Sequence, residues 1–357
     1  MTDPSSEKPK RRPRYSGKNP RKFLEKYKEL QPGRYAEDVA KVVARGATPA
    51  GMHRPILVRE VLEGLAPRPG DVVVDCTLGH GGHARELLTA VQPGGRLLGV
   101  DADPIELPKT EALLRSLGFP ESALVVRRMN YAGTAQFVAE EAPEGANVLL
   151  ADLGLSSMQI DDPSRGFSFK FDGPLDMRMN PSRELTASAL LSRLDESVLA
   201  RLLLENADEP RAHELASAIL LAHSRRPIAT THALASVIRA RFAPTSQGPG
   251  GAADDSVRRV FQALRIAVND EFNALDAFLR SLPNCLKPGA RAAILTFHSG
   301  EDRRVKSAFK AGLQDGWYAS ISQEVMRASP EERRDNPRST SAKLRFAVRS
   351  ERKRFEP

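Results

Sequence analysis

The chain has 357 residues, 41% of them hydrophobic and 27% charged, with a net charge of +8, a balance typical of a globular protein with an ordinary core. No apolar run approaches the ~18 residues of a membrane span, so we expect no membrane partner. The two cysteines, Cys76 and Cys285, show no disulfide or zinc-ligand spacing, so we expect no metal and a reducing, cytoplasmic location.

Most of the positive charge lies at the N-terminus. Residues 1–34 hold eleven Lys or Arg and four Asp or Glu, a net +7 that leaves +1 for the rest of the chain. Such an arm either binds a polyanion or serves as a solubilising tail, and charge alone does not separate the two. No apolar segment follows the charges, and prolines interrupt any amphipathic helix, so neither a secretory signal nor a transit peptide is predicted. We therefore expect residues 1–50 to form a basic, partly disordered N-terminal extension.

Helices and buried strands are predicted to alternate from Pro55 onward. Apolar residues between Leu57 and Leu65 recur at helical spacing. Three of the predicted strands that follow end in aspartate, and a parallel, doubly wound α/β sheet is the architecture that this alternation indicates. Short apolar runs place four strands at residues 72–75, 96–101, 123–127 and 147–152.

The strand pattern stops after the fourth strand. Residues 186–242 look helical throughout, and another buried strand is predicted at 290–297. Because strands resume after the helices, we expect an all-helical lobe at residues 165–258 that is inserted into the sheet domain. That sheet domain would be discontinuous and comprise residues 51–164 and 259–357.

A glycine-rich turn follows the first strand, in the run Asp75-Cys76-Thr77-Leu78-Gly79-His80-Gly81-Gly82-His83. Glycines at that place let the backbone approach a ligand closely. The spacing is not the G-x-G-x-x-G of dinucleotide enzymes. An acidic strand end suits a ligand with an ammonium group, such as the methionine part of S-adenosylmethionine. The turn by itself is a weak indication of a cofactor loop.

The second strand ends at Asp101, 22 residues after Gly79. A carboxylate at about that spacing can accept both ribose hydroxyls of an adenosine cofactor. Its neighbour Asp103 is more simply explained as a cap of the next helix. Tyr131, after the third strand, would lie either against an adenine ring or in the core.

Asp152 ends the fourth strand and is followed by the segment Leu153-Gly154-Leu155-Ser156-Ser157-Met158-Gln159. Reactive groups collect at the carboxyl ends of strands in open α/β sheets. Methyl transfer to an exocyclic amine is helped by an acceptor for the N–H groups, because the nitrogen lone pair is otherwise delocalised into the base. Asp152 is a candidate for that acceptor, and helix capping is the alternative for a lone aspartate at this place.

Residues beyond the fourth strand are candidates for binding the target. RNA enzymes commonly stack an extruded base on aromatic or apolar side chains. Alternatively, the aromatic residues of this stretch pack onto the helical lobe. His298, at the end of the last predicted strand, is either a catalytic or substrate-binding group or a hydrogen-bonded structural residue, the commoner role. The candidates for substrate binding are Phe167, Phe169, Asp176, Arg178 and His298.

Taken together, these motifs resemble the bacterial 16S rRNA (cytosine-N4)-methyltransferase family. The resemblance runs from His53 to Arg345 and includes runs such as Arg165-Gly166-Phe167-Ser168-Phe169 and Phe297-His298-Ser299. It implies a Rossmann-like class I methyltransferase fold with S-adenosylmethionine as the cofactor. It also implies methylation of the exocyclic N4 of a cytosine in the decoding centre of 16S rRNA, with the small ribosomal subunit as the partner. It leaves the oligomeric state open and places the N-terminal arm outside the family pattern.

Carried over residue by residue, the resemblance assigns a set of cofactor contacts, with Asp152 also the catalytic residue. Tyr131 stands where the family usually has Phe, which keeps an aromatic face. Two substitutions depart from the family pattern, because Gly300 replaces a Leu and Thr340 replaces an Arg. The implied cofactor contacts are Gly81, Gly82, His83, Asp101, Tyr131, Asp152 and Gln159.

Two functions from other classes fit the sequence less well. A ribosome-assembly protein that kept the fold and lost the activity would not need Asp101, Asp152 and the Gly81-Gly82-His83 turn, all of which are present. A nicotinamide-dependent dehydrogenase would need a different glycine spacing. The sequence therefore favours the methyltransferase.

Overall fold

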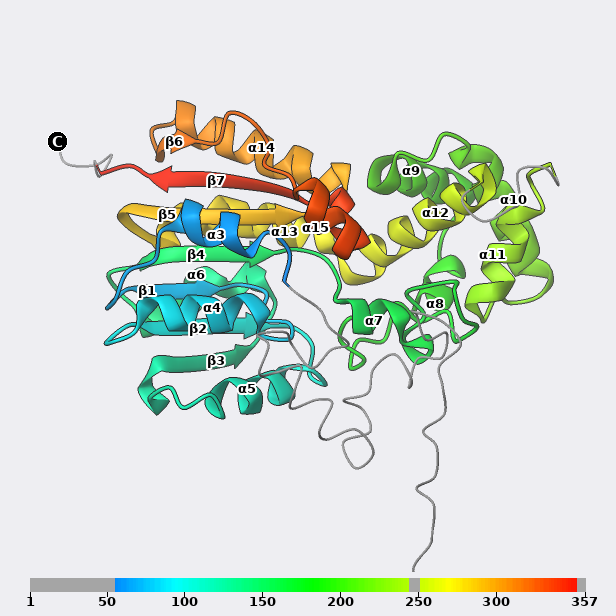
Figure 1. The fold of residues 1–357 in the computed structure, drawn as a ribbon. Coiled ribbons are helices and arrows are strands. Elements are labelled where there is room, and N and C mark those ends of the chain that lie inside the picture. Colours follow the sequence, from blue (N-terminus) through cyan, green and yellow to red (C-terminus); the bar gives the residue numbers. More distant parts are fainter. Residues whose placement is uncertain (1–54, 244–250, 352–357) are drawn as a thin grey trace, which may run out of the picture. The chain divides into compact units, whose positions relative to one another are not determined.

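The computed structural model describes residues 55–243 and 251–351, so the predicted N-terminal extension lies outside the described residues. Within these ranges seven strands form one sheet in the order β3-β2-β1-β4-β5-β7-β6 (Figure 1). The first five strands pair in parallel, and β7 pairs antiparallel with both β5 and β6. Their bounds are β1 (Val72–Asp75), β2 (Arg96–Asp101), β3 (Leu124–Arg128), β4 (Ala146–Asp152), β5 (Leu286–Thr296), β6 (Tyr318–Ile321) and β7 (Lys343–Arg349).

The central strands are buried on both faces, which explains their continuous apolar sequences. Successive side chains of a strand point to opposite faces of the sheet, so Val73 and Val74 belong to different hydrophobic clusters. Helices α3 (Val58–Leu65), α4 (Gly82–Val91) and α5 (Leu107–Arg115) contribute to the cluster of Val73. The cluster of Val74 is covered by α6 (Thr134–Glu141), α13 (Glu271–Ser281) and α14 (Ser299–Gln314). The predicted α/β sheet is therefore confirmed.

The strand order reverses between β1 and β4. The chain moves outward from β1 to β2 and β3, then returns to β4 on the other side of β1. In open α/β sheets ligands bind outside the carboxyl ends of the strands at such a switch point. Three of the strands that end there terminate in a carboxylate, namely Asp75, Asp101 and Asp152.

A separate helical region lies in the sequence between β4 and β5, two strands that are neighbours in the sheet (Figure 1). Its buried residues, such as Leu203 and Ile238, form a hydrophobic cluster of their own. Thr230 caps α11 by accepting the amide N–H of Ala233. The boundary expected between residues 258 and 259 falls inside α12, which contributes to this cluster along most of its length. The helices are α8 (Ala187–Leu191), α9 (Glu196–Ala207), α10 (Ala212–Arg225), α11 (Thr231–Arg239) and α12 (Ala252–Asn269).

No helix in residues 55–243 and 251–351 is both long enough and apolar enough to cross a membrane.

Short helices connect the main elements of the fold. The short elements are α7 (Ser157–Asp161), α15 (Pro330–Asp335), η2 (Glu121–Ala123), η3 (Tyr131–Gly133), η4 (Pro163–Arg165), η6 (Leu282–Cys285) and η7 (Pro337–Ser341).

Candidate active site

Asp75 begins the site at the end of β1. Its side chain is buried, and one carboxylate oxygen accepts the amide N–H of Thr77 at 3.0 Å. Burial raises the pKa of Asp75 to about 6, and the nearby charges of Asp152 and Asp101 act in the same direction. A cationic ligand at this position would lower the cost of these buried negative charges. The acids therefore fit the ammonium and sulfonium groups of S-adenosylmethionine.

The glycine turn is held against β2 and α5. The amide N–H of Gly79 donates to Oδ2 of Asp101 at 2.8 Å, and the hydroxyl of Thr110 donates to the carbonyl oxygen of Gly79 at 2.5 Å. Gly81, the N-cap of α4, has a φ of +74°, and a Cβ there would lie 3.0 Å from Cγ2 of Thr110. This turn therefore requires glycine both for its backbone angle and for its close packing.

Asp101 presents its carboxylate at the end of β2. One oxygen accepts the Gly79 N–H, and the other accepts the amide N–H of Asp103 at 2.8 Å. These bonds use one acceptor position on each oxygen, and each oxygen keeps a second. Burial raises the pKa of Asp101. The residue is thus placed as a two-hydroxyl acceptor would be, although its contact with a ribose stays a prediction.

Asp152 and His83 form the centre of the site. Nδ1 of His83 lies 3.5 Å from Oδ2 of Asp152, and its Nε2 lies 3.0 Å from the carbonyl oxygen of Ile56. Burial lowers the pKa of His83 and therefore favours the neutral ring. Since a carbonyl can only accept, the neutral ring carries its proton on Nε2 and directs the Nδ1 lone pair at Asp152.

The other oxygen of Asp152, Oδ1, is buried and has no hydrogen-bond partner among the described residues. Burial raises the pKa of Asp152 to about 7, and the negative charge of Glu301 adds to the shift. A buried acceptor without a donor is costly unless a ligand completes it. Asp152 thus combines a strongly raised pKa with a buried oxygen that has no donor among the described residues, which is typical of a functional carboxylate.

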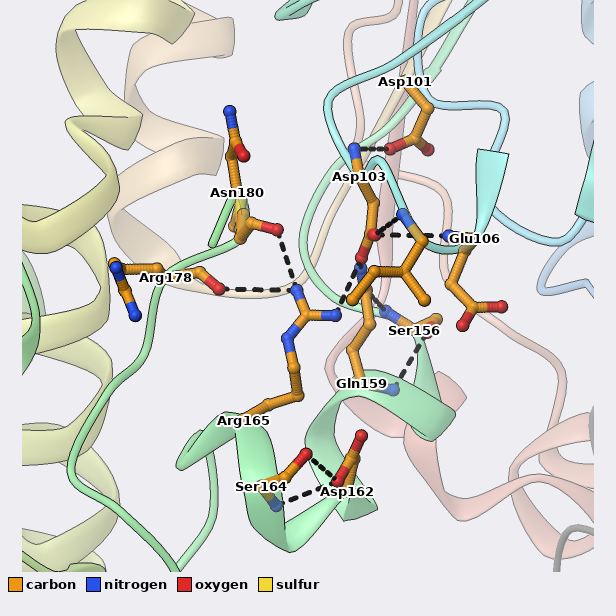
Figure 2. A network of polar contacts seen from close by, with 12 residues as sticks. Asp101, Asp103, Glu106, Ser156, Gln159, Asp162, Ser164, Arg165, Arg178 and Asn180 are labelled. Atoms are coloured by element: carbon orange, nitrogen blue, oxygen red, sulfur yellow. Dashed lines mark hydrogen bonds and ion pairs between the residues drawn. The ribbon is translucent and has the colours of Figure 1, made fainter. Parts of the chain in front are cut away.

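Gln159 lies beside Asp103, as Figure 2 shows. Its side-chain amide donates to Oδ2 of Asp103 at 2.7 Å, and its carbonyl oxygen accepts the amide N–H of Ser156 at 2.9 Å. Asp103 also accepts the amide N–H groups of Ile105 and Glu106 and so stabilises the turn before α5, although the N-cap of α5 is Glu106 and not Asp103 as expected. Both polar groups of Gln159 therefore have partners within the chain, and its contact with the cofactor stays a prediction.

Arg165 completes this network and is a residue that the sequence analysis did not single out as functional. It donates to Oδ2 of Asp103 at 3.0 Å, although 62 residues separate the two. The only sequence signal was its membership of the Arg165–Phe169 run. An arginine carries no periodicity that could reveal a partner so far away.

Tyr131 packs among core residues. Its ring lies edge-to-face against Phe278 of α13, with the ring centroids 5.5 Å apart, and its hydroxyl donates to the carbonyl oxygen of Glu271 at 3.4 Å. Burial raises its pKa above the ordinary value. These contacts are those of the core alternative, and a contact with adenine stays a prediction.

The aromatic candidates for target binding pack on the helical region. Phe167 is buried in its hydrophobic cluster. Phe169 is partly buried, lies edge-to-face against Phe261 at 5.6 Å and has the guanidinium of Arg239 5.2 Å from its ring centre. These contacts match the packing alternative, and a stacking role for either ring stays a prediction.

Asp176 and Arg178 form a two-pronged ion pair. Nε and Nη2 of Arg178 each donate to a different oxygen of Asp176, both at 2.7 Å. Burial would raise the pKa of Asp176, but its bonds with Arg178 hold the pKa below the ordinary value. Between the two, Met177 is fully buried with a φ of +64°, which a non-glycine residue rarely adopts. Such strain is often retained at functional sites, so this segment remains our candidate for target binding.

His298 caps α14. Its Nδ1 accepts the amide N–H of Glu301 at 3.4 Å, and the Glu301 carboxylate accepts the N–H groups of Phe297 and His298 in return. This is a capping box with histidine in the place of serine or threonine. The contacts are those of the structural role, and a contact with substrate stays a prediction.

The two departures from the family pattern differ in their environments. A Cβ on Gly300 would lie 2.6 Å from Cζ of Phe272, so the Phe272 ring fills the space that a leucine would need. Thr340 is exposed in η7, and nothing in the structure explains it.

Comparison with known proteins identifies the family of the chain. A family model described as the MraW methylase family matches residues 50–350. Ribosomal RNA small subunit methyltransferase H 2 of Alkaliphilus metalliredigens is 47% identical over 351 residues, which cover 98% of this chain and 100% of that protein. Ribosomal RNA small subunit methyltransferase H 1 of Lachnoclostridium phytofermentans is 46% identical, with 96% of this chain and 93% of that protein covered.

These matches bear on the arm and on the family. The family model begins at residue 50, as expected for an arm outside the family pattern, but the relative from Alkaliphilus aligns with 98% of the chain and therefore with most of the arm. The matched family agrees with the resemblance of the sequence motifs. The chain belongs to the MraW methylase family and is an S-adenosylmethionine-dependent methyltransferase with the Rossmann-like class I fold.

Proposed function

We propose that this protein transfers a methyl group from S-adenosylmethionine to the exocyclic N4 of a cytosine in 16S rRNA of the small ribosomal subunit, in the cytoplasm. Two relatives that are 47% and 46% identical to this chain are named as small-subunit ribosomal RNA methyltransferases. The observation that carries the chemistry is the buried Oδ1 of Asp152, which has no donor among the described residues.

The chain's own groups would hold the cofactor at the carboxyl ends of β1 and β2. Asp101 would accept the ribose hydroxyls, and the backbone of the turn at Gly81 and Gly82 would lie against the ligand. Asp75 and its neighbouring acids would face the cationic part of the cofactor. Burial raises the pKa of Asp75 to about 6, and a nearby positive charge would stabilise the ionised carboxylate. When bound, S-adenosylmethionine supplies an electrophilic methyl group on a sulfonium.

Asp152 would act on the amine that is methylated. An N–H of cytosine N4 would donate to the carboxylate of Asp152, which would localise the nitrogen lone pair toward the methyl donor. The acceptor then contributes most where charge develops, which raises the rate more than the affinity. After transfer the nitrogen carries one proton too many, and a carboxylate whose pKa is about 7 can take it.

His83 would hold that proton in place. With its own proton on Nε2 toward Ile56, the ring offers the Nδ1 lone pair to a protonated Asp152 at a distance of 3.5 Å. His83 would thus orient Asp152 and accept a hydrogen bond from its acid form. The proton would leave to water when the product departs.

Undermethylated small subunits and labelled S-adenosylmethionine test this function. We expect label in 16S rRNA and, by mass spectrometry of the digested RNA, N4-methylcytosine at one position. Asp152→Asn is the matched control, because it keeps the shape of the side chain and removes the negative charge. No incorporation into rRNA, or methylation at a position other than cytosine N4, would contradict the proposal.

A further inference from the structure

The segment from Arg165 to Asn180 is joined to the cofactor-binding turn through one buried ion pair (Figure 2). The side chains of Asp103 and Arg165 are 3% and 9% exposed. Burial alone would raise the pKa of Asp103, but the charge of Arg165 and the bond from Gln159 hold the pKa below its ordinary value. Removing either partner would leave the other charge buried and unpaired, which is costly.

Arg165 also holds the backbone of the segment. While Nη1 donates to Asp103, Nη2 donates to the carbonyl oxygens of Arg178 and Met179 at 3.3 and 2.8 Å. Its own carbonyl oxygen accepts the amide N–H of Met177 at 3.0 Å. The strained backbone of Met177 is thus fixed from the side of the cofactor site by the two ends of a single residue.

A second residue fixes the segment from the helical region. Asn269, at the end of α12, donates to the carbonyl oxygen of Met177 at 2.7 Å and accepts the amide N–H of Met179 at 2.8 Å. The segment therefore lies between two anchors. Arg165 also bonds to Asp103 in the cofactor-binding turn, whereas Asn269 has no bond to that turn within the part of the chain that the structure describes.

The contacts continue from Asp103 to the cofactor carboxylate. The amide N–H of Asp103 donates to Oδ1 of Asp101 at 2.8 Å. One turn therefore presents Asp101 to the ribose and Asp103 to Arg165. A cofactor that orders this turn would also order Arg165 and the backbone to which Arg165 donates. Once the turn is ordered, less conformational entropy is lost when the segment becomes ordered.

We propose that Arg165 is a positioning residue that couples the cofactor site to segment 165–180, so that bound cofactor sets the target-binding conformation of that segment. The inference rests on the proposed function in two respects, the identity of the cofactor and the assignment of the segment to the target. Arg165 touches neither ligand. It acts through Asp103 on one side and through the backbone of Arg178 and Met179 on the other.

Hydrogen exchange of the full chain tests the coupling without RNA. In the wild type, saturating S-adenosylhomocysteine slows exchange of amides in residues 176–180 by about fivefold, a usual size for coupling between two sites. Arg165→Gln abolishes this dependence at saturating ligand. By reciprocity the same substitution weakens ligand binding several-fold in calorimetry.

Arg165→Lys separates positioning from a general loss of stability. A lysine keeps the charge beside Asp103 but has no planar fork to reach two carbonyls as well. We expect it to restore most of the thermal stability lost in Arg165→Gln, without restoring the ligand-dependent protection. It also serves if Arg165→Gln does not fold.

The matched control is another arginine–aspartate pair with a buried arginine. Arg345 is 8% exposed and donates to Asp302 at 2.7 Å, in β7 and α14. Arg345→Gln should lower the stability and leave the ligand-dependent protection of residues 176–180 unchanged. The inference is overturned if the wild type shows no such protection, or if both Arg165 variants keep it at saturating ligand. Because this experiment contains no RNA, its failure is distinguishable from a failure of rRNA methylation.

Discussion

His83 directs Nδ1 at Oδ2 of Asp152 from 3.5 Å, while its Nε2 is tied to the carbonyl oxygen of Ile56 at 3.0 Å. A histidine held in this way cannot turn its ring without losing the bond to Ile56. Asp152 therefore has one oxygen beside a fixed base, and its second, buried oxygen has no donor among the described residues. The predictions for Asp152 follow from this arrangement.

The rate of methyl transfer should depend on the ionisation of Asp152. Since burial raises the pKa of Asp152 to about 7, the acceptor carboxylate forms only as the pH rises through that value. We expect kcat/KM for the cofactor to increase between pH 6 and pH 8 with an apparent pKa near 7, the value for Asp152 in the protein without bound cofactor. Asp152→Asn should react slowly at every pH. A wild-type rate that is flat over this range would exclude Asp152 as the acceptor.

The same pKa shift has a consequence for stability. Unfolded Asp has a pKa of about 3.9, lower than the folded value of about 7, so ionisation of Asp152 favours the unfolded chain. Its contribution is fully present below the unfolded pKa and is lost as the pH rises toward 7. We compare the free energies of unfolding of Asp152→Asn and the wild type by urea unfolding at pH 5 and pH 8. The stability of Asp152→Asn relative to the wild type should increase by about 1–3 kcal/mol from pH 5 to pH 8. The same difference in stability at both pH values would contradict the raised pKa.

Asp101 should be essential for cofactor affinity. Asp101→Ala removes the proposed two-hydroxyl contact and also the acceptor for the Gly79 and Asp103 N–H groups. We expect S-adenosylmethionine binding to weaken by about 1.5–3 kcal/mol in calorimetry, with the fold retained. Asp101→Asn keeps one oxygen, so its affinity for the cofactor should lie between those of the wild type and of Asp101→Ala. Unchanged affinity in a folded Asp101→Ala protein would contradict the assignment of Asp101 to the ribose.

Gly300 and Phe272 should be coupled. Because a Cβ at position 300 would lie 2.6 Å from Cζ of Phe272, we expect Gly300→Leu to destabilise the protein by about 1–3 kcal/mol through overpacking. In the presence of Phe272→Ala the same substitution should cost less, since the ring no longer occupies the space. Urea unfolding of the four proteins gives the coupling. Additive effects would show that the ring is not what excludes the leucine.

The N-terminal arm should contribute phosphate contacts. The arm lies outside the described residues, and this prediction rests on its charge of +7 in residues 1–34. If its deletion removes five phosphate contacts, the log–log slope of small-subunit binding against salt should fall by roughly 3.5–4.5, with cofactor affinity unchanged. Superimposable slopes for the two forms would make the arm a passive tail.

The sequence by itself determined the parallel part of the sheet and the positions of its acids. Short apolar runs predict β1, β2, β3 and β4 closely, because burial on both faces leaves a local pattern, whereas β6 and β7 were not predicted. The aspartates at the ends of β1, β2 and β4 follow from the same runs. The glycine turn and the long motifs then indicated the family, which the comparisons confirmed.

Only the tertiary structure decided which side chains meet. Asp103 and Arg165 are 62 residues apart, and a polar pair leaves no periodic pattern in the sequence. Packing between distant segments likewise decides three further contacts. It places Tyr131 beside Phe278, Phe167 in the helical cluster and the Phe272 ring over Gly300. Local sequence sets which residues are apolar and where strands end. Partner choice among buried groups is set by the folded geometry, since each must satisfy its charge or fill its space with whatever the fold brings near.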